Sequence, residues 1–140
     1  MKAFITPCLL RFSLAAVLLA ILFRYFLSHG IESHITVLIV LVSFLYGVGM
    51  FSAGWYFGKK DAEFLPIFDV GFRFHLATYL VHNVVSELWF VGGFNSEYEK
   101  VSVIHVTALC WGIFLLLHLA FYLRAREQTI RGLHKHDLFE

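Results

Sequence analysis

Apolar residues gather in four long runs along the chain, and short polar stretches separate these runs. The runs cover Leu9 to Leu27, Ile35 to Phe57, Phe72 to Val91 and Val101 to Leu123. About 20 apolar residues in a helix cross the hydrocarbon core of a bilayer, so each run is long enough to span it. The pattern predicts an all-α integral membrane protein with four transmembrane helices.

Composition supports placement in a lipid bilayer. Of the 140 residues, 59% are hydrophobic and 15% are charged, and the mean hydropathy is +0.75. A soluble domain of this size carries many more charged residues. The net charge of +1 comes without a basic arm or patch, so we expect no nucleic-acid partner. Cys8 and Cys110 do not form a redox or zinc spacing and are expected to be packing residues.

Basic residues indicate how the helices are oriented. Cytoplasmic loops of membrane proteins hold an excess of lysine and arginine. In a four-span arrangement nine basic residues fall on one side, with Arg24 and Lys100 on the other. The nine are Lys2, Arg11, Lys59, Lys60, Arg73, Arg124, Arg126, Arg131 and Lys135. Both termini are therefore predicted to be cytoplasmic, with Arg24 and Arg73 snorkelling to the membrane interfaces.

This arrangement divides the chain into four parts. Residues 1–58 form an N-terminal pair of transmembrane helices, the first of which is expected to be retained because no small-x-small cleavage site follows it. Residues 59–71 form a linker that is expected to lie along the membrane interface. Residues 72–124 form a helical hairpin, and residues 125–140 form a cytoplasmic basic tail.

Small residues recur along the second predicted helix. The stretch GWYFG places Gly54 and Gly58 four residues apart, and Gly47 lies four residues after Ser43. Small residues at this spacing allow helix backbones to approach closely inside lipid. We therefore predict that the second helix is the main packing element, either within the chain or in a homo-oligomer.

The third helix carries an unusual number of polar residues. His75, Tyr79, His82 and Ser86 are spaced by four, three and four residues. At 3.6 residues per turn they form one narrow stripe along the helix. Unsatisfied polar groups are costly in hydrocarbon, so this stripe is predicted to face protein or water.

The length of the following turn predicts what the stripe meets. If GGFNSEYEK turns near residue 96 or 97, His75 lies level with His118, and Glu87 lies level with His105 or Val106. His105 and His118 point to different sides of the fourth helix, so the two pairs belong to separate contacts. The inner contact is expected to join His118 to the stripe, and the outer one to join Glu87 to His105.

The hairpin resembles a known family. FHLATYLVHNVV, a short polar turn, WGIFLLLHLAFYL and the tail RAREQTIRGL are similar to the bacterial 2TM domain family. The family pattern H-x3-Y-x3-N, followed by G-W-G-I and a later histidine, falls on His75, Tyr79, Asn83, Trp111 and His118. Cys110 stands where the family commonly has glycine, and the resemblance covers about residues 70–135. It implies a helical hairpin in the bacterial inner membrane without an established activity.

Several functions remain open for the polar residues. One interpretation is structural: His75, Tyr79, His82 and His118 hydrogen-bond between helices in a non-enzymatic anchor, sensor or assembly subunit. A second is a cofactor site formed by His75, Tyr79, His82 and His118, with His75 and His118 as ligands of haem b or a transition metal. A third is a proton or ion path that uses Glu87, His105 and the stripe, with Asn83 and Trp111 beside it. The sequence shows neither a candidate nucleophile nor an acid–base pair, so we do not predict an enzyme. Besides the lipid bilayer, the expected partners are further copies of the chain or a larger membrane complex.

Overall fold

The computed structural model consists of four helices joined by short connections. It describes residues 4–136, and their side chains as far as residue 128. The helices are α1 (Pro7–Glu32), α2 (Thr36–Asp61), α3 (Ile67–Val91) and α4 (Val101–His136). The predicted all-helical class is confirmed.

Three of the four helices are long and apolar enough to cross a membrane. They are α1, α2 and the described part of α4, Val101–Gln128, with mean hydropathies between 1.9 and 2.1. α3 is long enough, with 25 residues, but its charged and polar residues leave it insufficiently apolar. By length and composition, three of the described helices are candidate membrane spans, whereas the sequence analysis predicted four.

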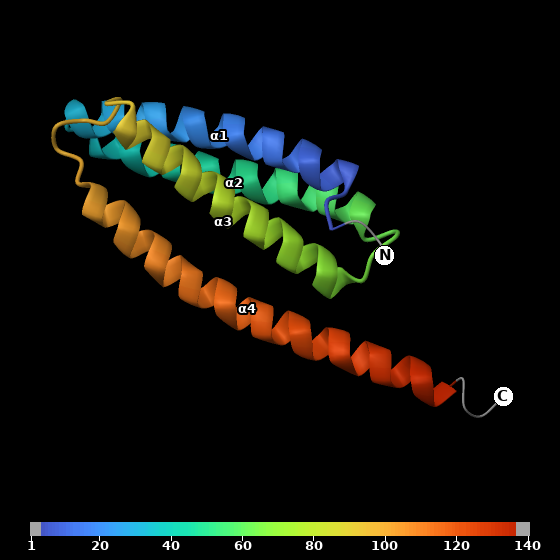
Figure 1. Cartoon of the computed structure of the whole chain (residues 1–140). Helices are drawn as coiled ribbons and strands as arrows, with labels where there is room; N and C mark the ends of the chain where they lie inside the picture. Colours follow the sequence, from blue (N-terminus) through green and yellow to red (C-terminus); the bar gives the residue numbers. More distant parts are fainter. Residues whose placement is uncertain (1–3, 137–140) are drawn as a thin grey trace.

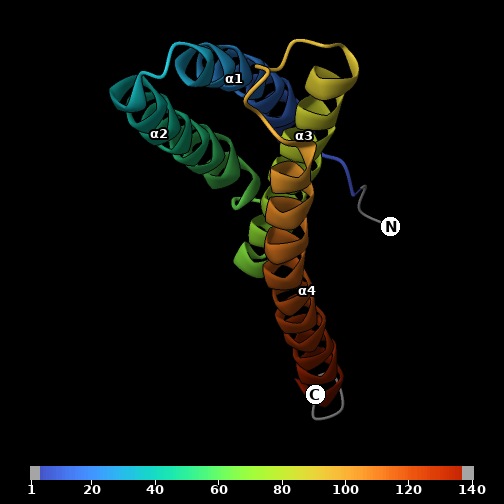
Figure 2. The ribbon, with the colours of Figure 1, turned by 90° about the vertical axis from the view of Figure 1, so that its left-hand side faces the viewer.

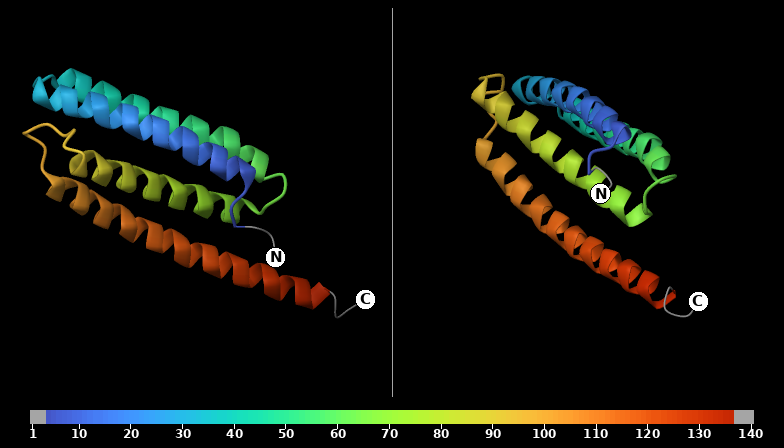
Figure 3. Two further views of the ribbon diagram at one scale, coloured as in Figure 1. Left: turned by 45° about the horizontal axis from the view of Figure 1, so that its top comes forward. Right: turned by 45° about the vertical axis from the view of Figure 1, so that its right-hand side comes forward.

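The helices form a layered bundle with α3 at its centre. α1 and α2 lie side by side as an antiparallel pair, and α3 runs between this pair and α4 (Figure 1, Figure 3). α3 contacts all three other helices, whereas within the described residues α4 packs against α3 alone. The C-terminal part of α4 extends beyond the end of the bundle where α2 and α3 connect (Figure 2).

The closest packing lies along α1. One face of this helix is buried over five successive turns by residues spaced four apart: Phe12, Ala16, Ala20, Arg24 and Ser28. The two alanines let neighbouring backbones approach, as expected for small residues at helix interfaces in lipid. The main packing face is thus on α1 and not on α2.

The glycines of α2 contribute unequally. A Cβ placed on Gly54 would meet Phe12 at 3.8 Å, and one on Gly58 would meet Val70 at 3.6 Å. These are ordinary contacts with α1 and α3. A Cβ on Gly47 would meet nothing within 4 Å, so Gly47 makes no close approach inside the chain.

The helices are longer than their apolar runs, and the connections are correspondingly shorter. Thr6 caps α1, its hydroxyl oxygen accepting from the backbone N–H of Leu9 at 3.0 Å, and Pro7 follows in the first turn. α2 continues to Asp61 and α3 begins at Ile67, so the expected 59–71 linker is mostly helical. α4 likewise continues as a helix through the first part of the expected tail, up to His136.

Two arginines lie inside the bundle, each beside a carboxylate, and their snorkelling to the membrane interfaces stays a prediction. Arg24 is 5% exposed, and its Nη2 lies 2.6 Å from Oε2 of Glu99, in the connection between α3 and α4. Its guanidinium also stands 5.3 Å from the ring centre of Phe90. Arg73 pairs with Asp69 one turn earlier on α3, at 2.6 Å between Nη2 and Oδ2. A nearby carboxylate neutralises each of the two charges. Asp69 lies on the same helix as Arg73, whereas Glu99 belongs to the connection between α3 and α4, which brings it next to Arg24.

The Arg24–Glu99 pair leads to a stability prediction. Removing one partner of a buried ion pair leaves an uncompensated charge, which costs about 3–5 kcal/mol. Glu99→Ala should therefore strongly lower the free energy of unfolding, measured by denaturant titration in detergent. The double variant Arg24→Leu/Glu99→Leu should recover most of this loss.

The matched control is Glu97→Ala in the same loop, because Glu97 is exposed and has no ion pair among the described residues. It should be nearly neutral. A loss below about 1 kcal/mol for Glu99→Ala, as for a solvent-exposed pair, would contradict the burial of this contact.

Candidate functional site

The polar residues of α3 point towards three different helices. His75 meets α4, His82 meets α2, and Trp89 donates to the Ser28 hydroxyl of α1 at 3.0 Å. Thr78 and Asn83 instead bond to backbone carbonyls of α3 itself. Three of the four stripe residues, His75, Tyr79 and His82, therefore bond to protein groups, which helps a helix this polar to occupy the centre of the bundle.

His75 and His118 form the inner contact predicted from the hairpin register. Their Nδ1 atoms are 2.9 Å apart, and their ring centres are 5.2 Å apart. Trp111 donates its indole N–H to Nε2 of His75 at 2.7 Å. Both ring nitrogens of His75 are thus engaged, by two residues of α4 that lie two turns apart.

These contacts determine where the imidazole protons lie. An indole nitrogen can only donate, so Nε2 of His75 must accept. A neutral His75 then carries its proton on Nδ1 and donates to Nδ1 of His118, which in turn carries its proton on Nε2. Protonating either ring would place two donors face to face. The arrangement therefore requires both histidines to be neutral.

The same geometry bears on the haem and metal hypothesis. A haem iron with two axial imidazoles needs about 2.0–2.1 Å to each nitrogen, so the two nitrogens would lie about 4 Å apart on opposite sides of the iron. The observed 2.9 Å is a hydrogen-bonding distance, and Trp111 occupies the second nitrogen of His75. Within the part of the chain whose side chains are described, no three His, Cys, Asp or Glu residues gather as a metal site. As placed, His75 and His118 are too close together to be the two axial ligands of one haem iron.

Tyr79 packs closely against α4. Its hydroxyl donates to the carbonyl of Ala108 at 3.2 Å, and its ring meets Trp111 edge to face, with 5.8 Å between ring centres. A Cβ at position 112 would lie 3.2 Å from the Tyr79 hydroxyl, so Gly112 provides the space that this contact needs. Asn83 donates to the Tyr79 carbonyl at 2.7 Å and so belongs to the same region.

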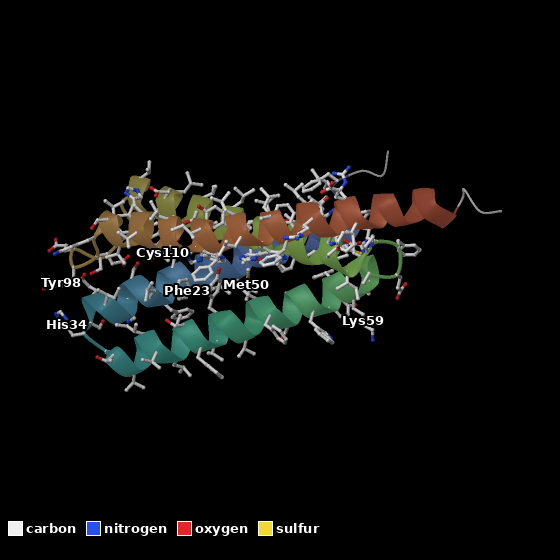
Figure 4. The ribbon with its side chains drawn as sticks, turned by 90° about the horizontal axis from the view of Figure 1, so that it is seen from below. Phe23, His34, Met50, Lys59, Tyr98 and Cys110 are labelled. Atoms are coloured by element: carbon white, nitrogen blue, oxygen red, sulfur yellow. The ribbon has the colours of Figure 1, made fainter. Side chains whose placement is uncertain are left out.

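His82 turns away from His75 and towards α2. Its Nδ1 lies 3.0 Å from the hydroxyl of Tyr46, whose ring stacks on Phe23 with 4.5 Å between centres. Phe23 projects from α1 towards the middle of the bundle, far from the end where His34 and Tyr98 meet (Figure 4). The Trp111 ring lies between the two histidines, 6.1 Å from His75 and 5.5 Å from His82 between ring centres. Sequence reasoning grouped His82 with His75 and missed Tyr46.

Glu87 and His105 form the outer contact, also as the register predicted. Nε2 of His105 lies 2.9 Å from Oε1 of Glu87, and the side chains are 61% and 43% exposed. Among the described side chains, no hydrogen bond joins this pair to the buried stripe. The outer pair and the inner polar residues are therefore separate contacts, and a proton path between them stays a prediction.

A double-mutant cycle tests the inner contact. His118→Leu leaves the Nδ1–H of His75 without an acceptor, whereas His75→Leu leaves both Trp111 and His118 unpaired. Each unsatisfied buried group costs about 1–3 kcal/mol, so both variants should lose stability and His75→Leu should lose more. The double variant should lose less than the sum of the singles.

The control is Cys110→Leu, because Cys110 is an exposed residue of the same helix. It should change stability little. Strict additivity of His75→Leu and His118→Leu, measured by denaturant titration in detergent, would show that the two residues do not interact.

Comparisons with known proteins do not assign this site. No protein-family model matches the chain, and neither the curated proteins nor the solved structures contain a significant match. The resemblance to the 2TM domain family stays a prediction, and a function must be argued from the geometry of the chain itself.

Proposed function

We propose that this chain is a non-enzymatic, multi-pass protein of the bacterial inner membrane that acts as an anchor or assembly subunit. In this proposal all four helices cross the bilayer and both termini are cytoplasmic. The half-buried histidines and Tyr79 fix α3 to its neighbours, and the exposed faces of α2 and α4 contact lipid and a partner protein. The outward Glu87–His105 pair is the observation that carries the assembly role.

The position of α3 supports a fourth span. Its 25 residues extend about 37 Å at 1.5 Å per residue, which exceeds the roughly 30 Å of a bilayer core. It packs lengthwise between α1 and α4, which are both candidate spans (Figure 3). Its polar side chains bond to protein groups, so low hydropathy does not prevent it from crossing with them.

The Glu87–His105 pair supports a protein partner. Ionisable side chains within membrane helices almost always face protein or a water-filled cavity. This pair is instead substantially exposed on the surface of the isolated chain. Beside it, α4 carries a continuous exposed apolar face, and within the described residues it packs against α3 alone. A second chain that covers this face would bury the pair and brace α4.

The resemblance to the 2TM domain family agrees with this proposal. The hairpin of α3 and α4 is the part that is similar to the family, and it is also the part that carries the incompletely covered surface. The pair α1 and α2 would then serve as the membrane anchor to which the hairpin is attached. A catalytic role finds no support, because the titratable groups are used in contacts between helices.

Topology mapping tests the orientation. Epitope tags at both termini should be reachable only after the cytoplasmic side of the membrane is opened, because nine of the eleven basic residues fall on that side. A cysteine that replaces Asn95 should react with an impermeant maleimide from outside. External labelling of the C-terminal tag would reverse the proposed orientation or remove one span.

Site-specific photocrosslinking tests the assembly role. A photoreactive amino acid at Leu109, which is 65% exposed one turn from His105, should give a discrete protein adduct in the native membrane. The same group at Leu45, on the exposed face of α2, serves as a control and should give mainly lipid adducts. An adduct of twice the chain mass would identify a homo-oligomer. Lipid adducts alone at Leu109 would contradict the proposal.

A further inference from the structure

A cavity of about 340 Å³ lies at the end of the bundle where α1 ends and the connection from α3 to α4 begins. Figure 1 shows this connection passing beside the end of α1. The cavity is large enough for a small molecule. The lining residues that matter most here are Tyr25, Glu32, Trp89, Phe94, Ser96 and Glu97.

The charge of the cavity wall is negative. Glu32 ends α1 and Glu97 belongs to the connection, and both residues are exposed. Within the described part of the chain, neither carboxylate has an ion pair, and no lysine or arginine lines the cavity. His29 lines it as well and gains a positive charge only when it is protonated. The wall therefore favours a cationic ligand over an anionic one.

The hydrogen-bond donors of the wall are already directed to protein acceptors. Trp89 donates its indole N–H to the Ser28 hydroxyl at 3.0 Å, and the Ser96 hydroxyl donates to Oε2 of Glu32 at 2.5 Å. An ionised carboxylate offers about four lone-pair sites, so Glu32 and Glu97 retain capacity to accept further hydrogen bonds. A ligand that is positively charged and donates hydrogen bonds would complement this wall.

Aromatic rings form the other part of the wall. The rings of Trp89 and Phe94 lie 5.3 Å apart between centres, and Tyr25 also lines the space. Phe94 is 65% exposed, yet its ring lies close over the backbone of Gly92, where an added Cβ would be 2.5 Å from Cε2 of Phe94. Aromatic rings attract a cation that lies within about 6 Å of the ring centre, and tryptophan attracts it most strongly.

Carboxylates next to aromatic rings distinguish an organic cation from a metal ion. Among the described side chains, no three His, Cys, Asp or Glu residues gather closely enough to hold a metal. Hard metal ions prefer a shell of oxygen ligands. An organic ammonium group uses both parts of the wall, since its charge suits the carboxylates and its carbon atoms suit the rings.

The cavity is placed where such a group occurs in a membrane. α1 is a candidate span, and the cavity lies at its end and not along its middle. The 26 residues of α1 extend about 39 Å at 1.5 Å per residue, which exceeds the roughly 30 Å of a bilayer core. The cavity therefore lies at the level of the lipid headgroups, in contact with water.

We propose that this cavity binds an organic ammonium group, with the carboxylates of Glu32 and Glu97 beside the charge. The rings of Trp89 and Phe94 pack against the adjoining carbon atoms. Two sources carry this chemistry at a membrane surface: the ethanolamine headgroup of a phospholipid and a free amine in solution. The site is independent of the assembly role, because it does not use the outer face of α4.

Fluorine NMR tests the site without removal of a tryptophan. Protein labelled with 5-fluorotryptophan gives one signal for each of its three tryptophans, and Trp89→Phe identifies the signal of Trp89. In micelles of a neutral detergent at constant ionic strength, n-butylammonium chloride should shift this signal in a saturable manner. n-Butanol has the same carbon chain without the charge and should not do so. The signals of Trp55 and Trp111, which lie outside the cavity, should not move.

Variants locate the binding. Glu97→Gln removes one exposed charge and should weaken binding of n-butylammonium about twofold to fivefold. Glu32→Gln/Glu97→Gln should weaken it at least fivefold. Phe94→Leu removes a ring but keeps an apolar side chain, and should weaken it about twofold to fivefold. The matched control is Glu63→Gln, an exposed glutamate in the connection at the opposite end of the bundle, which should leave binding unchanged.

Nanodiscs distinguish the two sources. In phosphatidylglycerol, which has no ammonium group, the Trp89 signal should keep its free position until n-butylammonium is added. A signal that is already at the bound position in phosphatidylethanolamine, and that n-butylammonium no longer moves, would identify the lipid headgroup as the ligand. A signal at the free position in phosphatidylethanolamine, which n-butylammonium still moves, would identify a free amine.

Three outcomes would overturn the proposal. One is a shift of the Trp89 signal that does not saturate or that n-butanol reproduces. Another is equal binding in Glu32→Gln/Glu97→Gln and Glu63→Gln, which would reduce the acids and rings to ordinary membrane-interface surface. The third is a Trp89 signal that is the same in both lipids and that n-butylammonium cannot move. Circular dichroism and thermal unfolding check each variant, and the exposed positions of Glu97 and Phe94 make these two substitutions compatible with folding.

Discussion

The structure depends on one constraint, which is that the polar side chains of α3 need partners inside the protein. Water is absent from a bilayer core, so an unpaired polar group there costs more than any single apolar contact contributes. α3 meets this constraint by directing His75 to α4, His82 to α2 and Trp89 to α1. The polar residues that make α3 a poor span by composition are therefore the ones that hold it at the centre of the bundle.

The same constraint orders the two ends of the bundle. Arg24 would be untenable on α1 without an acid nearby, and the connection after α3 supplies Glu99. Ser96 in that connection also donates to Glu32 at 2.5 Å, which ties the loop to the end of α1. At the other end Arg73 is held by Asp69 and by the carbonyl of Phe4. Contacts of charged side chains thus connect the helices at both ends of the bundle. Hydrogen bonds between uncharged side chains connect them in the middle.

The position of α4 determines both the exposed surface of the hairpin and the cavity beside it. Within the described residues α4 packs against α3 alone, which leaves the Glu87–His105 pair and the neighbouring outer face of α4 exposed. α4 and α2 do not pack against each other in this part of the chain, and a cavity lined by all four helices lies between them. Trp111 lines this cavity, and its indole N–H donates to His75 of the His75–His118 pair. The direct hydrogen bond within this pair favours a role in positioning Trp111 over a role as a metal ligand pair.

The sequence by itself determined the helical class, the number of helices and the pairing within the α3–α4 hairpin. Helix spacing and a short turn relate residues that lie close in the chain, so His75 with His118 and Glu87 with His105 followed from simple counting. Tertiary structure decided the contacts that join distant segments: Arg24 with Glu99, His82 with Tyr46, and the buried face of α1. These contacts depend on the rotation and tilt of each helix. Rotation and tilt follow from side-chain packing across the whole bundle and leave no periodic signal in the sequence.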